Sequence, residues 1–114
     1  MASAADLSLP DRVREIVRQD LTSGKLTTDS LARRLGMSSR TLHRRLVAQK
    51  VTYRGILDEV RRKIALRCLQ DPKLSIREVG ELLGFTTSPA FHRAFRRWTG
   101  TTASSFRSRS LLQR

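Results

Sequence analysis

Two identical dipeptides, His43-Arg44 and His92-Arg93, carry side chains suited to reading another polymer, and they stand 49 residues apart. An arginine guanidinium offers two parallel N–H groups that match the O6 and N7 acceptors of guanine in the major groove of DNA. Each dipeptide lies inside a longer repeated pattern, so this chemistry recurs together with its surroundings. Both pairs are therefore candidate contacts to base edges.

Histidine is also a metal ligand, but His43 and His92 have no cysteine or carboxylate companions at ligand spacing. We therefore expect no metal and no cofactor. The chain offers no nucleophile beside a base and no glycine-rich phosphate loop. Asp58 and Glu59 are adjacent, and adjacent residues of a helix do not face each other, so they make no acid–base pair. We expect no enzymatic activity.

Each dipeptide lies on the second helix of a predicted helix-turn-helix, a unit present twice, at 31–46 and 79–95. The first helix of each copy carries a small residue where two helices cross, Ala32 or Gly80. Positions before the turn repeat after 48 residues and positions after it repeat after 49, so the second copy holds one extra turn residue. Inside a helix, Gly80 costs about 1 kcal/mol relative to alanine, which indicates close packing there.

Helical periodicity runs along the chain, and no useful length alternates with a period of two. The predicted fold class is all-α, with two helix-turn-helix subdomains joined by a long linker helix and about seven helices. The helices are expected at about 10–21, 28–36, 40–49, 53–70, 75–84, 88–98 and 103–108. Their expected caps are Thr27 or Thr28, Ser39, a capping box from Ser75 to Glu78, and Thr87 or Ser88.

The expected domain organisation follows from these helices. It comprises a flexible N-terminal tail at 1–8, a first subdomain at 9–51, a linker helix at 52–71, a second subdomain at 72–108 and a C-terminal tail at 109–114. About 18 residues of linker helix span roughly 27 Å. With the width of the flanking units, this length allows two recognition helices, about 40–49 and 88–98, to enter successive major grooves about 34 Å apart.

The charge favours a polyanionic partner. The chain has 23 lysines and arginines against 10 acidic residues, a net charge of +13. A GC-rich genome would also favour arginine over lysine, but it would not produce the net charge. The single cysteine, Cys68, allows no internal disulfide, and its place in an apolar pattern predicts a buried, inert thiol. No apolar run approaches the roughly 18 residues of a membrane span, and there is no secretion signal, so we expect a cytoplasmic protein.

Three stretches of sequence resemble one family. They are Ser75-Ile76 through Gly84-Phe85 and Ala90-Phe91-His92-Arg93-Ala94-Phe95-Arg96-Arg97-Trp98-Thr99-Gly100, preceded by the stretch 53–66. Together they resemble the C-terminal DNA-binding domain of AraC/XylS-family transcription regulators, in the branch with an arabinose-operon or ornithine-regulator type of N-terminal ligand domain. The resemblance covers about 27–107. It implies direct, usually activating, control of bacterial promoters, often by contact with RNA polymerase subunits.

The resemblance also implies a set of DNA contacts. Base-reading residues would be Arg40, His43, Arg44, Ser88, Pro89, His92 and Arg93. Backbone contacts would come from Ser39, Thr41, Arg45, Lys50, Arg54, Thr87, Arg96 and Arg97. In family members, effector binding and dimerisation often lie in a larger N-terminal domain, which this chain lacks; its short polar start favours an excised DNA-binding domain over a stand-alone member.

Three positions depart from the family pattern. Val51 stands where a glycine is common, so the exit of the preceding helix is expected to differ. Thr102-Ala103 replaces the usual Ser/Thr-Pro before the last helix. Pro89 donates no side-chain hydrogen bond, which makes an apolar contact to a thymine methyl the natural expectation there.

Sequence-specific binding of double-stranded DNA is the leading hypothesis. One alternative is a basic protein-interaction module that docks RNA polymerase or another acidic partner. Another is a non-specific binder of nucleic acid or anionic surfaces. The duplicated turn favours the leading hypothesis, because adsorption to a charged surface requires no such geometry.

Overall fold

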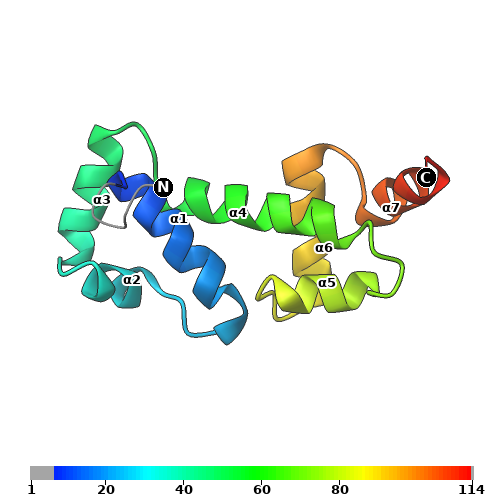
Figure 1. Ribbon diagram of the computed structural model, residues 1–114, viewed down its shortest axis with the longest axis horizontal. Coiled ribbons are helices and arrows are strands. Elements are labelled where there is room, and N and C mark those ends of the chain that lie inside the picture. Colours follow the sequence, from blue (N-terminus) through cyan, green and yellow to red (C-terminus); the bar gives the residue numbers. More distant parts are fainter. Residues whose placement is uncertain (1–6, 114) are drawn as a thin grey trace. The chain divides into compact units, whose positions relative to one another are not determined.

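The computed structural model describes residues 7–113, which form seven α-helices and one short 3-10 helix, with no strand among them (Figure 1). The elements are α1 (Leu9–Asp20), η2 (Leu21–Ser23), α2 (Thr28–Arg34), α3 (Ser39–Ala48), α4 (Tyr53–Cys68), α5 (Ile76–Leu82), α6 (Ser88–Thr99) and α7 (Ala103–Leu112). The predicted all-α class with two helix-turn-helix motifs is confirmed.

The chain ends differ from the sequence prediction. Most of the expected tail at 1–8 lies outside the described residues, but Ser8 caps α1, and its Oγ accepts a hydrogen bond from the Asp11 amide at 3.2 Å. Helix α7 continues to Leu112, beyond the predicted end at 108, so residues 109–112 belong to the helix rather than to a tail. No glycine or proline follows Phe106 to end the helix earlier.

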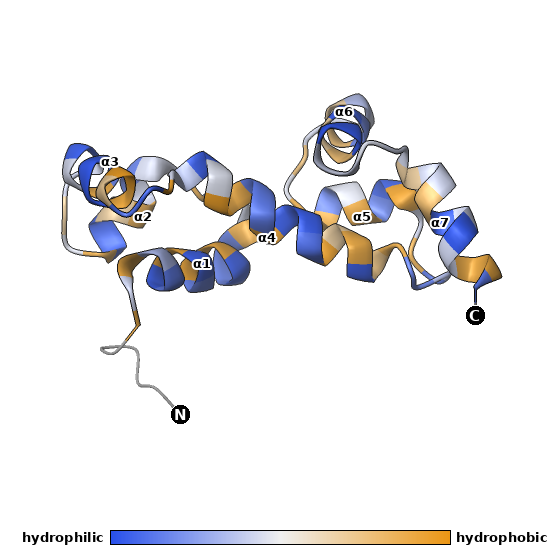
Figure 2. Ribbon diagram, turned by 90° about the horizontal axis from the view of Figure 1, so that it is seen from above, coloured by the Kyte–Doolittle hydropathy of each residue, from blue (hydrophilic) through white to orange (hydrophobic). Residues whose placement is uncertain are grey.

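The chain divides into two compact units, Met1–Val60 and Arg61–Arg114, so the boundary falls inside α4. Each half of α4 contributes buried residues to its own unit, Val60 to the first and Ala65 to the second. The partition that treats 52–71 as a separate linker therefore stays a prediction. Figure 2 shows hydrophobic and hydrophilic residues alternating along the helices, as expected where each helix buries one face.

In the first unit, α1, α2, α3 and the first half of α4 enclose an aliphatic core. Its fully buried side chains include Val13, Val17, Leu31, Leu42 and Leu46. Helix α2 begins with a capping box, in which Thr27 and Ser30 bond each other's backbone amides. The glycine that ends this helix, Gly36, has a φ of +72°, a left-handed conformation that glycine adopts without steric cost.

In the second unit the core is aromatic. Phe91 and Phe95 of α6 are buried, whereas Trp98 is half-buried. The Phe91 ring lies 5.7 Å from Phe85 and 6.0 Å from Phe95, between ring centroids. Helix α5 begins with the predicted capping box between Ser75 and Glu78. This core fixes which face of α6 points outward.

Gly80 explains how α5 and α6 approach each other. A Cβ atom at this position would lie 3.1 Å from the Phe91 ring, closer than ordinary van der Waals contact. The predicted close packing at Gly80 is confirmed. The equivalent positions of the first unit hold Ala32 and Leu42. The first unit thus combines a larger residue on the first helix of the motif with a smaller one on the second, and the second unit does the reverse.

Candidate nucleic-acid interface

Helix α3 presents the first set of predicted base-reading residues. Ser38, rather than the expected Ser39, caps the helix, and its Oγ accepts a hydrogen bond from the Thr41 amide at 3.1 Å. Leu42 and Leu46 are fully buried and fix the rotation of α3 about its axis. The opposite face therefore points to solvent, and the three predicted reading side chains on it are all exposed: Arg40, His43 and Arg44.

Helix α6 presents the second set in the same way. Thr87 caps the helix by accepting a hydrogen bond from the Ala90 amide at 3.3 Å, and Pro89 lies in the first turn, where a missing N–H is harmless. Phe91 and Phe95 occupy the buried face. The four predicted reading residues of this helix are all exposed: Ser88, Pro89, His92 and Arg93.

The reading arginines are not engaged by other residues of the protein. Within residues 7–113, Arg40, Arg44 and Arg93 form no hydrogen bond or ion pair with another residue. A guanidinium in this state keeps all its N–H groups available for a ligand. The structure thus brings one Arg-His set together in each unit, and both sets carry unopposed positive charge.

The predicted backbone contacts fall into two groups. Arg45, Lys50, Arg54, Arg96 and Arg97 are long cationic side chains and all are exposed. The hydroxyl residues instead have internal roles, since Ser39 donates to the Asp29 carboxylate and Thr41 accepts from the Ser38 hydroxyl at 3.0 Å. The Thr87 hydroxyl is the cap of α6.

The exit of α3 shows why the departure at Val51 matters. The left-handed residue here is Lys50, with a φ of +63°, whereas Gly100 follows α6 with a φ of +77°. Val51 corresponds to Gly100, but it is β-branched and disfavours positive φ. The left-handed residue that follows α3 therefore stands one position earlier, at Lys50. Among the described residues, Lys50 is the one non-glycine residue in this conformation. It is also a predicted phosphate contact, and such strain is often found at functional positions.

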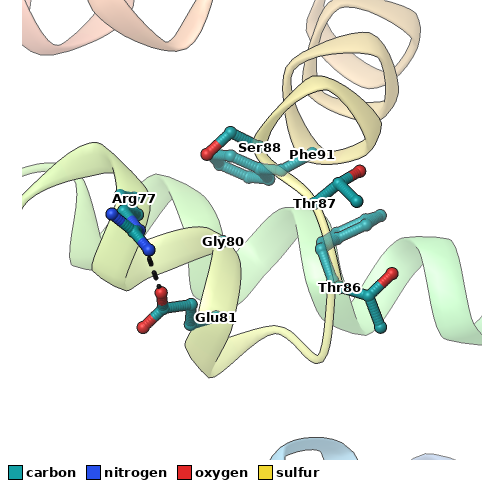
Figure 3. Close-up of a pocket in the computed structure, with 8 residues that line it drawn as sticks. Arg77, Gly80, Glu81, Thr86, Thr87, Ser88 and Phe91 are labelled. Carbon is teal, nitrogen blue, oxygen red and sulfur yellow. Dashed lines mark hydrogen bonds and ion pairs between the residues drawn. The ribbon is translucent and has the colours of Figure 1, made fainter.

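A small pocket opens where α5 meets the start of α6 (Figure 3). Its volume is about 300 Å³. The lining residues are Arg77, Gly80, Glu81, Phe85, Thr86, Thr87, Ser88 and Phe91. Arg77 forms an ion pair with Glu81 at 3.2 Å along one wall. The hydroxyl residues that line it, Thr86, Thr87 and Ser88, carry O–H groups of the kind that phosphate oxygens accept.

Several arginines are part of the protein framework instead. The guanidinium of Arg61 lies 4.4 Å from the Phe85 ring centroid, and its Nε donates to the Leu83 carbonyl at 3.1 Å. These two contacts hold the end of α5, so Arg61 is part of the framework of the second unit. Arg107 similarly donates to the Leu69 carbonyl at 3.0 Å.

Arg14 of α1 bonds Glu59 of α4 at 2.7 Å within the first unit. Hydrogen bonding to Glu59 raises the pKa of Arg14 above its ordinary value, and the nearby Asp11 carboxylate adds to this effect. The Arg14 guanidinium therefore stays charged and belongs to the framework of α1 and α4.

Sequence reasoning missed Arg61, Arg107 and the exposed apolar residue Val47. A signal for Arg61 existed, because Arg61 stands four residues from both Leu57 and Ala65 on the packed side of its helix. Residues 7–113 contain no cluster of three or more His, Cys, Asp or Glu side chains that could hold a metal. None of the helices described is long and apolar enough to span a membrane.

The chain is similar in sequence to known helix-turn-helix regulators. A family described as "Helix-turn-helix domain" matches residues 31–109. The ornithine utilization regulator of Pseudomonas aeruginosa is 43% identical over 79 residues, covering 69% of this chain and 23% of the relative. The HTH-type transcriptional regulator VirS of Mycobacterium tuberculosis is 34% identical over 104 residues, covering 91% of this chain and 31% of the relative. The chain thus spans less than a third of these relatives.

Solved structures show the same fold. A DNA-binding transcriptional dual regulator from Escherichia coli K-12 aligns with a TM-score of 0.88 at 26% identity, covering 99% of this chain and all of that one. The transcriptional regulator CdpR from Pseudomonas aeruginosa aligns with a TM-score of 0.82 at 37% identity, covering 89% of this chain and 32% of that one.

Proposed function

Because this chain belongs to the AraC/XylS family and carries its helix-turn-helix DNA-binding domain, we propose that α3 and α6 each read one major groove of a double-stranded promoter. The base-reading residues are Arg40, His43 and Arg44 in the first unit and Ser88, Pro89, His92 and Arg93 in the second. Successive grooves on one face of the duplex would require two recognition boxes about one helical turn, roughly 34 Å, apart.

One observation carries this proposal. The same His-Arg pair occurs at the same position of both second helices, exposed and free of ion pairs in each. Burial of Leu42 in one helix and Phe91 in the other holds the two pairs outward. A surface that only attracted polyanions would have no reason to repeat this register.

The predicted backbone contacts act on the phosphates of the DNA. Arg45, Lys50, Arg54, Arg96 and Arg97 contact phosphates, with support from Ser39, Thr41 and Thr87. Phosphate contacts orient the protein but carry no sequence information. Each contact also releases counterions, so the logarithm of the affinity falls with the logarithm of salt concentration by about 0.9 per phosphate neutralised.

The proposal extends to the whole regulator. Two relatives are named as activators, among them the transcriptional activator NphR of Rhodococcus, so we assign this domain to an activator that acts in the bacterial cytoplasm. It would bind its promoter beside RNA polymerase, contact polymerase subunits and catalyse no reaction. Effector binding and dimerisation would belong to an N-terminal domain of the whole regulator.

The first test is selection from a random duplex pool of about 30 base pairs at 150 mM salt, followed by variants measured on the selected site. We expect two short boxes about one helical turn apart. Arg93→Ala should cost about 1–3 kcal/mol at one base position and relax preference there. Arg96→Ala should weaken all sequences alike and flatten the salt slope by about 0.9.

Arg12→Ala is the matched control, because Arg12 is an exposed arginine of α1 outside both recognition helices. It removes the same charge and should leave the base preference unchanged. A single selected box would leave one unit as a backbone clamp. If no sequence is enriched, or if Arg93→Ala and Arg96→Ala act alike on all DNA, the assignment of reading residues is wrong and docking to an acidic protein becomes the better hypothesis.

A further inference from the structure

Helix α3 carries an exposed apolar side chain on its reading face. Val47 is 49% exposed, while Leu46 next to it is fully buried. Val47 stands three residues after Arg44, four after His43 and seven after Arg40, the spacings that place side chains on one face of a helix. It therefore lies among the charged reading residues and away from the core.

The choice of valine at this position is unfavourable for the helix by itself. Valine has a lower helix propensity than alanine, lysine or arginine, and here little burial compensates for it. A residue that contradicts the local preference without packing in return is typical of a functional position. In the second unit the equivalent position holds Arg96, so the apolar side chain is specific to α3.

The direction of the Val47 side chain also places it beside the reading residues of α3. Side chains of an α-helix tilt toward its N-terminus, so Val47 covers the surface over the turn that holds His43 and Arg44. In the major groove, the only apolar group on a base edge is the C5-methyl of thymine. A valine next to a guanine-reading arginine is suited to contact that methyl.

We propose that Val47 is a further specificity-determining residue, which selects thymine next to the base pair read by Arg44. This inference rests on the proposed function, because it requires α3 to lie in the major groove. It predicts that the box read by α3 contains one thymine whose methyl group contributes to affinity. The box read by α6 lacks this contact, since Arg96 takes the place of Val47.

The test combines a protein variant with a single-atom-group change in the DNA. Each thymine of the selected site is replaced in turn by deoxyuridine, which lacks only the C5-methyl, and affinity is measured for the unaltered protein, for Val47→Ala and for Val47→Thr. At one position the unaltered protein should lose about fourfold in affinity, the equivalent of about 0.8 kcal/mol for one buried methyl. Val47→Ala should show no loss at that position, and 5-methylcytosine there should bind better than cytosine.

Folding does not confound this test. Val47→Ala replaces an exposed helical valine by a stronger helix former, so the variant should be at least as stable. Leu82→Ala is the matched control, because Leu82 is a 40% exposed apolar residue on α5, outside the reading face. It should keep the full response to deoxyuridine.

The outcomes separate the two proposals. If the protein prefers its selected site and Arg44→Ala reduces that preference, but Val47→Ala keeps the full response to deoxyuridine at every position, this inference is overturned and the proposed function stands. If no sequence is preferred at all, the proposed function fails first. A loss of transcription activation in Val47→Ala with unchanged DNA affinity would also overturn the inference, in favour of a protein contact at Val47.

Discussion

The crossing of α5 over α6 should respond to Gly80→Ala in a way that depends on residue 91. The added Cβ would lie 3.1 Å from the Phe91 ring, inside the ordinary contact distance of about 3.5–4.0 Å. Overpacking of this kind costs about 1–3 kcal/mol, whereas replacing glycine by alanine inside a helix gains about 1 kcal/mol. We therefore expect Gly80→Ala alone to lower the free energy of unfolding by about 1 kcal/mol.

The effect of Gly80→Ala on the free energy of unfolding should change sign when the Phe91 ring is removed. The equivalent crossing of the first unit already combines an alanine with a leucine, Ala32 and Leu42, both buried. In a Phe91→Leu background, Gly80→Ala should therefore stabilise the protein by about 1 kcal/mol, a coupling of about 2 kcal/mol between the two sites. Phe91→Leu alone should be destabilising, because it leaves a smaller side chain against Phe85 and Phe95.

The assay is urea unfolding of the four proteins of the double-mutant cycle, followed by circular dichroism. Ala32→Gly is the control, since it removes a helical methyl in the first unit and should cost about 1 kcal/mol or more with no reversal. Effects that add within about 0.5 kcal/mol would refute the reasoning, because they would mean that Phe91 moves aside without penalty.

Three further predictions concern single residues. Lys50→Gly should raise the free energy of unfolding by about 1 kcal/mol, because glycine relieves the positive φ, and should weaken binding to all DNA sequences, measured by urea unfolding and titration. Arg61→Lys should lower the melting temperature by removing the Nε bond to Leu83 and weakening the contact with Phe85, at a cost of about 1–2 kcal/mol, with no change in the salt slope of DNA binding. Trp98→Phe should cost less than about 1.5 kcal/mol by thermal unfolding, because the buried Trp98 Nε1 has no hydrogen-bond partner to lose.

Local signals accounted for most of the fold. The capping box at Ser75 and the caps at Thr27 and Thr87 each depend on residues within one turn, so capping rules were sufficient to predict them. The end of α7 was misplaced because nothing in the sequence marks it. The helix continues through residues 109–112 although Leu111 and Leu112 are exposed, because no residue there breaks it.

The candidate site was predicted less completely. Exposure of Arg44 and Arg93 followed from the buried residues beside them, so the two Arg-His sets could be found from spacing alone. The role of Arg61 could not, because its partners, Phe85 and the Leu83 carbonyl, lie more than 20 residues away in sequence. Charge alone does not distinguish an arginine that holds a helix end from one that faces DNA.

The boundary between the two units has a consequence for folding cooperativity. It divides the 16 residues of α4 at Val60, so each unit contains only about two turns of α4. An isolated helix shorter than about 12–15 residues is marginal in water, because nucleation is unfavourable and few bonds follow it. Each half of α4 therefore depends on packing against the core of its own unit. Melting of one unit would release its half of α4 and leave the other half to fray from the boundary, so loss of one unit should lower the stability of the other.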